Sequence, residues 1–262
     1  MTAAITADSA GYAGSLDVSQ TSRVPMSRLL RVELRKMVDT RAGMWLMIAI
    51  AVLTTGVLII FLANADHKTF VNAMQASAIP QSILLPVLGI LLITQEWSQR
   101  TGMVTFTLEP HRGKVLWSKV AAAIVLGLAA VAVSMVVATV VTLLGGSAGA
   151  WHGVTVGTLL QYVLLEVIGV VGGLVFGLLL LNSAAAIVLS FAIPIAFSIV
   201  TSLWKAIKDA QPWIDPGTAQ TPLQQGDVLS SHQWAHLAVS SLIWVVLPFV
   251  IGLWRVLRAE VK

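Results

Sequence analysis

The 262-residue sequence contains no cysteine, and charged side chains make up only 11% of it. Without cysteine the chain has no disulfide, no thiol nucleophile and no cysteine-ligated metal site. A soluble domain carries about 25% charged residues, so this chain has too few charges to solvate the surface of a soluble protein. These shortages exclude a soluble enzyme, a disordered regulator and a compact nucleic-acid-binding domain.

Apolar residues take the place of the missing charges and form 57% of the chain. A membrane-spanning helix needs roughly 20 apolar residues. Five runs meet this length, and a sixth is weaker because it contains two prolines, a glutamine and a serine. Asn182 and Ser183 are the only polar break between two adjacent runs and predict a very tight turn. The sequence predicts an all-α integral membrane protein with six transmembrane helices, at about 44–63, 76–94, 120–144, 159–181, 184–203 and 237–256.

The basic residues indicate the orientation of this six-span chain. One side receives the N-terminal region, the 95–119 loop, the Asn182 turn and the C-terminus, and it holds all but three of the 16 Lys and Arg residues. The other side holds only Lys68, Lys205 and Lys208. An excess of Lys and Arg marks cytoplasmic loops. Both termini are therefore expected in the cytoplasm, in a multi-pass protein of a bacterial cell (inner) membrane.

Two segments lie outside the spans and have distinct patterns. Residues 1–24 predict a disordered cytoplasmic tail, and residues 25–262 form a single six-helix transmembrane domain. The 26–41 segment predicts an amphipathic helix in the cytoplasmic interface, the alternative being a solvated extension of the first span. Prolines and glycines in 204–236 predict short helices and turns that form a small outer lid. The apolar stripe of the 26–41 helix contains Leu30, Leu34, Met37 and Val38.

Glu166 is the only acidic residue deep in a predicted span. Burying a charge there costs roughly 2.5–3.5 kcal/mol on insertion scales. Such a residue is a candidate for a transport path, as a proton or cation relay or a polar contact with substrate. The alternative is a structural carboxyl that bonds neighbouring helices together, with Gln161 or Ser190 as its partner.

Glycines recur at every fourth position of the same span, at Gly169, Gly173 and Gly177. Small residues with this spacing let two helix backbones approach closely inside a bilayer. The spacing predicts a helix-packing face, within one chain or between two chains.

His232 and His236 are separated by one helical turn, as in the zinc-protease pattern H-E-x-x-H. Gln233 occupies the position of the catalytic glutamate, and a glutamine cannot accept a proton from zinc-bound water. The sequence also has no Walker pattern G-x-x-x-x-G-K-[ST]. We expect no catalytic residues, no cofactor or metal site and no nucleotide hydrolysis by this chain.

The inner loop between the second and third spans reads QEWSQRTGMVTFTLEPHRGKVLWSK. Glu96 and Arg100 are spaced to pair on a short helix, Gly102 can end that helix, and Pro110 precedes the next one. The loop resembles that of the membrane subunits (permeases) of bacterial type 2 ABC exporters. His111 and the order of Thr101 and Gly102 depart from the family pattern. The residues that carry the resemblance are Glu96, Arg100, Gly102, Leu108, Pro110, Arg112, Leu116 and Lys119.

The resemblance implies that this loop docks on a separate cytoplasmic ABC ATPase subunit, which binds ATP and Mg and drives export. In such an assembly Glu96 and Arg100 order the coupling loop, while Arg112 and Lys119 hold it near the headgroups. A second permease copy or paralogue completes the path, in a lipid bilayer and without nucleic acid. The competing hypotheses are an ion-coupled secondary transporter centred on Glu166, an intramembrane metal enzyme using the two histidines, and a non-transporting membrane scaffold.

Overall fold

The computed structural model describes residues 24–99, 107, 109, 111–145, 149–226 and 228–258. All regular structure within them is helical. The described part of the chain contains six helices long and apolar enough to cross a membrane, as predicted from the sequence. They are α2 (Arg41–Asn64), α3 (Phe70–Ser98), α5 (Arg112–Gly145), α6 (Val156–Leu180), α7 (Ser183–Leu203) and the last span, Ser231–Arg258, which comprises α10 (Ser231–Ser241), a π turn (Leu242–Val246) and α11 (Leu247–Arg258).

Helix α3, which has the weakest sequence signal, is the central helix of the bundle. It packs against α2, α5, α6 and α7, and 56% of its most apolar window is buried. Because protein rather than lipid surrounds it, its polar side chains find partners in neighbouring helices. Gln81 donates to Ser134 on α5 and accepts from Tyr162 on α6 at 3.3 Å.

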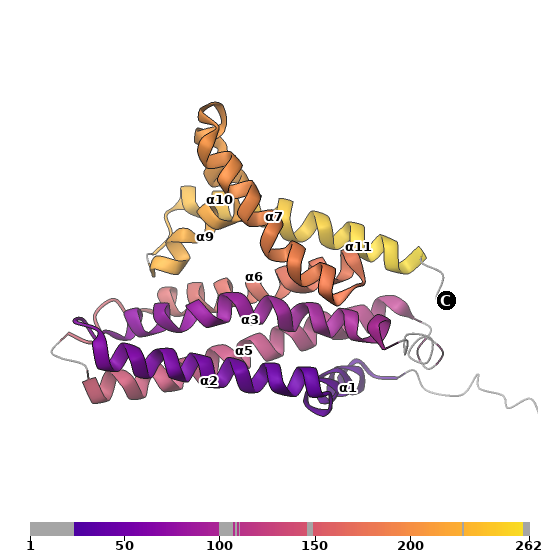
Figure 1. Ribbon diagram of the computed structural model, residues 1–262, viewed down its shortest axis with the longest axis horizontal. Helices are drawn as coiled ribbons and strands as arrows, with labels where there is room; N and C mark the ends of the chain where they lie inside the picture. The colour runs from indigo at the N-terminus through magenta and orange to yellow at the C-terminus, as the bar shows by residue number, and fades with distance from the viewer. Residues whose placement is uncertain are drawn as a thin grey trace, which may run out of the picture.

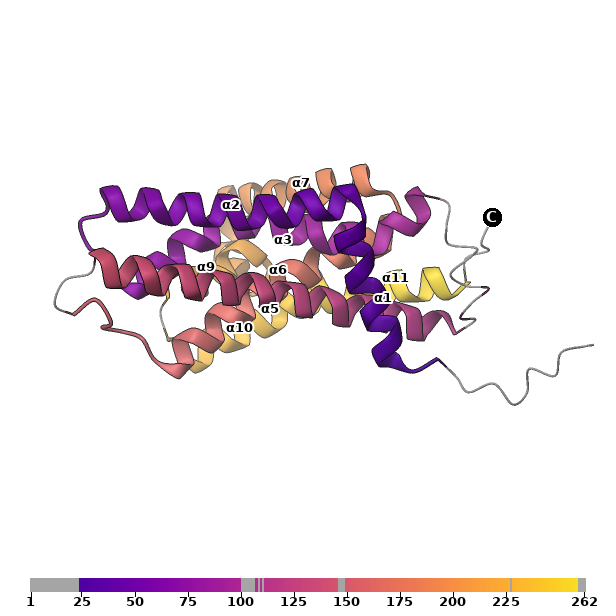
Figure 2. The ribbon, with the colours of Figure 1, turned by 90° about the horizontal axis from the view of Figure 1, so that it is seen from below.

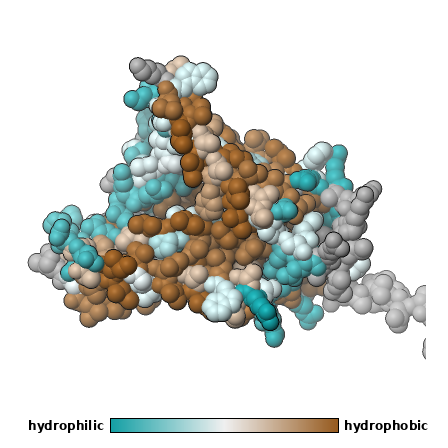
Figure 3. Space-filling view, viewed as in Figure 1, coloured by the Kyte–Doolittle hydropathy of each residue, from teal (hydrophilic) through white to brown (hydrophobic). Residues whose placement is uncertain are grey.

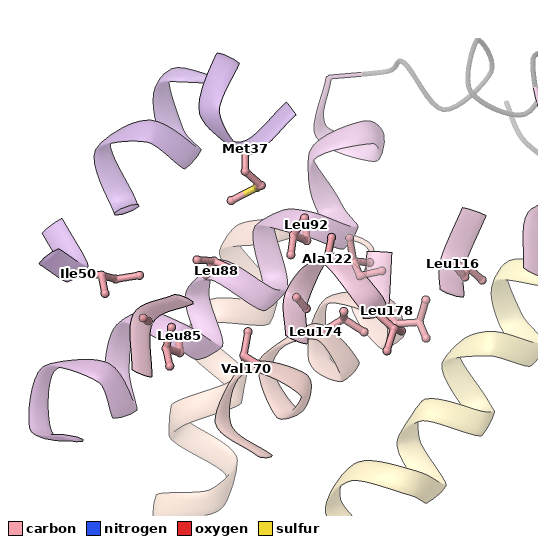
Figure 4. Close-up of a cluster of buried hydrophobic side chains, with 14 of the residues drawn as sticks. Met37, Ile50, Leu85, Leu88, Leu92, Leu116, Ala122, Val170, Leu174 and Leu178 are labelled. Atoms are coloured by element: carbon pink, nitrogen blue, oxygen red, sulfur yellow. The ribbon is translucent and has the colours of Figure 1, made fainter. Parts of the chain in front are cut away.

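The main core joins five helices around α3 (Figure 4). Met37 of the first helix, α1 (Met26–Asp39), points into this cluster and is fully buried. Val256 near the end of α11 belongs to the same cluster. The two ends of the described chain are therefore fastened to one end of the bundle, where Figure 1 also shows the junction between α6 and α7.

Helix α1 runs across the ends of α2 and α5 rather than along them (Figure 2). Thr40 separates α1 from α2 and caps α2 by accepting a hydrogen bond from the Gly43 amide at 3.3 Å. The buried residues of α1 are Glu33 and Met37, with Leu30 and Leu34 partly buried. The predicted stripe was wrong in one member, since Val38 is 55% exposed. Glu33 lies on the buried face instead.

The predicted turn between α6 and α7 is confirmed and contains two residues. Leu181 adopts the left-handed conformation, with φ = 53°, and Asn182 caps α7 by accepting a hydrogen bond from the Ala185 amide at 3.0 Å. Helix α7 then diverges from α3 and α6 (Figure 1). Ala186 and Thr201 are its only buried residues.

The 204–236 segment contains the short helices that its prolines and glycines predict. These are a 3-10 helix (Lys205–Ala210), α8 (Gln211–Ile214) and α9 (Pro216–Gln225). Helix α9 packs against α6 and α7. In the face shown in Figure 3, hydrophobic side chains dominate the middle of the molecule, whereas hydrophilic ones gather towards its two ends and on the flank where α9 lies.

Candidate functional site

Four charged side chains meet where α1 crosses the bundle. Glu33 and Lys36 come from α1, Glu96 from the last turn of α3 and Lys119 from the second turn of α5. We call these four residues the charge cluster. Lys119 is fully buried, and Glu33 and Glu96 are 3% and 2% exposed. The cluster thus joins three helices through one half-buried and three buried charged side chains.

Short contacts connect all four groups of the charge cluster. The Lys36 ammonium donates to Glu33 at 2.8 Å and to Glu96 at 2.7 Å. The Lys119 ammonium donates to Glu33 at 2.7 Å, lies 3.4 Å from Glu96, and donates to the Leu92 carbonyl at 3.1 Å. Buried charges are tolerated when each has an opposite partner and further hydrogen bonds. Each of the two cations and two carboxylates has an opposite partner here.

The position of Lys119 corrects the sequence-based prediction that it holds the loop near lipid headgroups. Its side chain points into the protein because two carboxylates neutralise it there. Arg112 likewise has a protein partner, donating to the Val256 carbonyl at 3.0 Å. This carbonyl lies in the last turn of α11, where a cation is favoured electrostatically.

Glu33 was not identified from the sequence, although one signal was available. Residues 30, 33, 34 and 37 share the buried face of a mainly basic helix, and Glu33 is the only acidic residue among them. Its role depends on Lys119, which is 86 positions further along the chain. Glu96 was identified, but Arg100, Gly102 and Pro110 of the predicted loop site lie outside the described residues.

Two opposing effects act on the pKa of Lys36. Burial favours the neutral form, but the carboxylates of Glu33 and Glu96 outweigh it and raise the pKa of Lys36 above its ordinary value of 10.5. A raised lysine pKa stabilises the fold fully below the unfolded pKa, and this stabilisation is lost as the pH rises through the folded value.

We expect the stability difference between the wild type and Lys36→Gln to stay constant from pH 7 to about pH 10 and to shrink above about pH 10.5. Thermal unfolding in detergent across this range measures the difference. A stability difference that already shrinks between pH 7 and pH 9 would contradict the pairing of Lys36 with Glu33 and Glu96.

The start of α5 has a second, more exposed set of contacts. Glu109 lies 2.9 Å from the His111 ring and 3.4 Å from the Lys114 ammonium. The hydrogen bond with His111 lowers the pKa of Glu109 below its usual value. Lys114 also donates to the Val24 carbonyl, next to the start of α1. This hydrogen bond connects the start of α5 to the residues that lead into α1.

Glu166, on α6, is 3% exposed. Its neighbour one helical turn away is Tyr162, whereas Ser190, which the sequence offered as a partner, donates to the Ile187 carbonyl at 2.9 Å. The Tyr162 hydroxyl also lies 2.9 Å from Ser77. Tyr162 therefore links α6 to Ser77 and Gln81 of α3 by hydrogen bonds. Tyr162, one of only two tyrosines, was missed by sequence reasoning.

The three spaced glycines of α6 lie in two different environments. A Cβ on Gly173 would lie 2.0 Å from the Pro86 carbonyl oxygen, and one on Gly177 would lie 3.1 Å from Ile90. Both glycines therefore pack against α3 within the same chain. Gly169 does not, because an added Cβ would meet nothing within 4 Å. It lines a cavity instead.

The rings of His232 and His236 pack edge-to-face against Trp213. The His236 and Trp213 ring centroids are 4.4 Å apart. Gln233 belongs to a capping box, since it accepts from the Ser230 amide at 2.8 Å and its own amide donates back to Ser230. In the described parts of the chain, no group of three potential metal ligands is found. The local helix cap explains the glutamine at this position.

Comparison with known proteins yields no family assignment: no protein-family model matches the chain, and no curated protein shows significant sequence similarity to it. The structure and the residues of the loop therefore carry the functional argument.

Proposed function

We propose that this chain is the membrane-spanning permease subunit of an ATP-driven exporter in a bacterial inner membrane. A separate cytoplasmic ATPase subunit supplies ATP hydrolysis, and a second permease copy or paralogue completes the path. Both termini lie in the cytoplasm, and α1 lies in the cytoplasmic interface. The charge cluster is the observation that carries the proposal.

The charge cluster brackets the proposed docking loop. Glu96 is three residues before the end of the described α3 segment, and Lys119 is in the first turns of α5, so the two residues flank the loop from 99 to 111. Their ion pairs with Glu33 and Lys36 connect both sides of the loop to α1. A displacement of the loop by a docked ATPase would consequently move α1, α3 and α5 together.

Two features support an in-plane position for α1. The helix crosses the ends of the spans (Figure 2), and Arg28, Arg31 and Arg35 are exposed while Met37 is buried. Exposed arginines on a helix that crosses the ends of the spans suit contact with anionic headgroups.

The test begins with purification of the tagged chain from its host in mild detergent, followed by ATPase measurements on the purified complex. We expect a stoichiometric ATPase whose turnover depends on the permease. We expect Glu96→Gln to retain the complex but to reduce permease-dependent stimulation several-fold, because the charge that couples α3 to α1 and α5 is lost.

Asp39→Asn is the matched control. It also removes one carboxylate from the α1 region, but Asp39 forms only an exposed pair with Arg35. Unchanged stimulation in Glu96→Gln would refute the coupling role. Transport driven by a proton or sodium gradient in the absence of any ATPase, and abolished by Glu166→Gln, would instead favour the ion-coupled alternative, which Glu166 in a cavity wall keeps open.

A further inference from the structure

A cavity of about 510 Å³ lies between α3, α6, α7, α9 and the π turn of the last span. Drug-sized ligands occupy pockets of about 300–1,000 Å³, so the volume suits a small organic molecule. Helix α7, which diverges from α6 in Figure 1, forms one wall through Ser190, Phe191 and Pro194. None of the four residues of the charge cluster lines this cavity.

Two glycines of α6 face the cavity. Cβ atoms built on Gly169 and Gly172 would meet nothing within 4 Å, so these positions have free space in front of them. Gly173, one helical turn after Gly169, contacts α3 and also borders the cavity. The absence of side chains at Gly169 and Gly172 therefore contributes directly to the volume of the cavity.

The ionisable lining of the cavity is acidic. Among the described residues that line it, Glu166 is the only ionisable side chain, and none is a lysine, arginine or histidine. Gln75, Gln220 and Gln224 supply neutral hydrogen-bonding groups. An anionic ligand would find no cation there to offset its desolvation, whereas a cation would face a buried carboxyl.

Aromatic rings complete the lining. Phe176, Phe191 and Trp244 all border the cavity. The Trp244 ring is held in place because its indole N–H donates to the Ile214 carbonyl at 2.8 Å and its ring lies edge-to-face with Phe197, at 5.2 Å between centroids. Pro248 cannot donate the helical hydrogen bond to the Trp244 carbonyl, and the helix widens into a π turn at this point. Fixed aromatic faces attract cations.

We infer that this cavity binds a lipophilic organic cation, with its charged group near Glu166 and its apolar body against the aromatic rings and the glycine wall. That this cation is the exported substrate rests on the proposed function. That the cavity binds it concerns this chain alone. The combination of a carboxyl, aromatic rings and no lining base among the described residues selects this class of ligand over anions.

The test uses two probes of similar size and shape but opposite charge, tetraphenylphosphonium and tetraphenylborate. Binding of each to the purified full-length chain in detergent is measured by equilibrium dialysis, with empty micelles as the background. We expect saturable binding of tetraphenylphosphonium and none of tetraphenylborate. Glu166→Gln is expected to weaken cation binding about tenfold by removing the carboxylate.

A second variant tests whether the ligand occupies this cavity. Gly172→Leu places a side chain into the free space and is expected to weaken tetraphenylphosphonium binding by about tenfold or more, since it removes room for the ligand. Gly56→Leu is its control, because Gly56 lies on α2, also has nothing within 4 Å of an added Cβ, and is remote from the cavity lining. Thermal unfolding establishes that each variant is folded.

Three outcomes overturn the inference: equal saturable binding of both probes, unchanged cation binding in both Glu166→Gln and Gly172→Leu, or no saturable binding of the cation. None of them bears on the ATPase complex. Failure of cation binding alongside a permease-dependent ATPase would reject the ligand class and leave the proposed function standing. Binding without any ATPase would reject the proposed function and leave the cavity assignment standing.

Discussion

Replacing Lys119 by methionine is expected to lower the free energy of unfolding by about 3 kcal/mol or more. The side chain is fully buried and contacts both Glu33 and Glu96. Its removal leaves two carboxylates in a nearly dry site with only the half-buried Lys36 to neutralise them. Breaking a buried pair costs more than the pair contributes, because an uncompensated charge remains. Equilibrium unfolding in detergent measures the loss.

Arg35→Met is the control for this change. It also removes one cation, in this case from α1. Arg35 pairs with Asp39 through side chains that are 80% and 63% exposed, and exposed pairs contribute roughly 0–1 kcal/mol. Adding Glu33→Gln to Lys119→Met should recover part of the lost stability, because it removes one uncompensated carboxylate. A Lys119→Met protein as stable as Arg35→Met would show that the charge cluster does not hold α1 to the bundle.

The second large effect is expected at Gly173. In Gly173→Ala the new methyl group would lie 2.0 Å from the Pro86 carbonyl oxygen and 2.4 Å from its Cα, and both are backbone atoms that cannot rotate away. Helices α3 and α6 must separate, with an expected loss of about 3 kcal/mol. Unfolding in detergent again provides the measurement.

Gly169→Ala, one turn away on the same helix, is the matched control. Its added Cβ has free space, and alanine favours a helix interior by about 1 kcal/mol over glycine. We expect unchanged or slightly increased stability for it. Equal effects of the two substitutions would mean that the glycines act through helix propensity and not through close packing.

The spans were predictable from sequence because hydrophobic length is a local property. The second apolar run, at about 76–94, has a weaker hydrophobic signal than the others. The structure gives the reason, which is the position of its polar side chains. Gln81 and Ser77 are satisfied by Ser134 and Tyr162 of other helices, so a central helix tolerates polar groups that a lipid-facing helix does not. Hydropathy alone does not distinguish these two situations.

The candidate sites were less predictable, since they depend on contacts between distant segments. Glu96 was identified from the loop pattern and Glu166 as an acid inside a span. The partners of Glu96 nevertheless come from α1 and α5, and the cavity beside Glu166 requires α7 and α9. The regular glycine spacing predicted three equivalent positions. The orientation of α6 makes Gly169 a cavity residue and Gly173 a packing residue.

The two-residue turn at Leu181 and Asn182 has a mechanical consequence for the cavity. A helix of the 21 residues of α7 is about 30 Å long at 1.5 Å per residue. A rotation of about 10° at its base would displace its far end by roughly 5 Å at that length. Because α7 supplies Ser190, Phe191 and Pro194 to the cavity wall, small torsional changes at the turn would alter the width of the cavity.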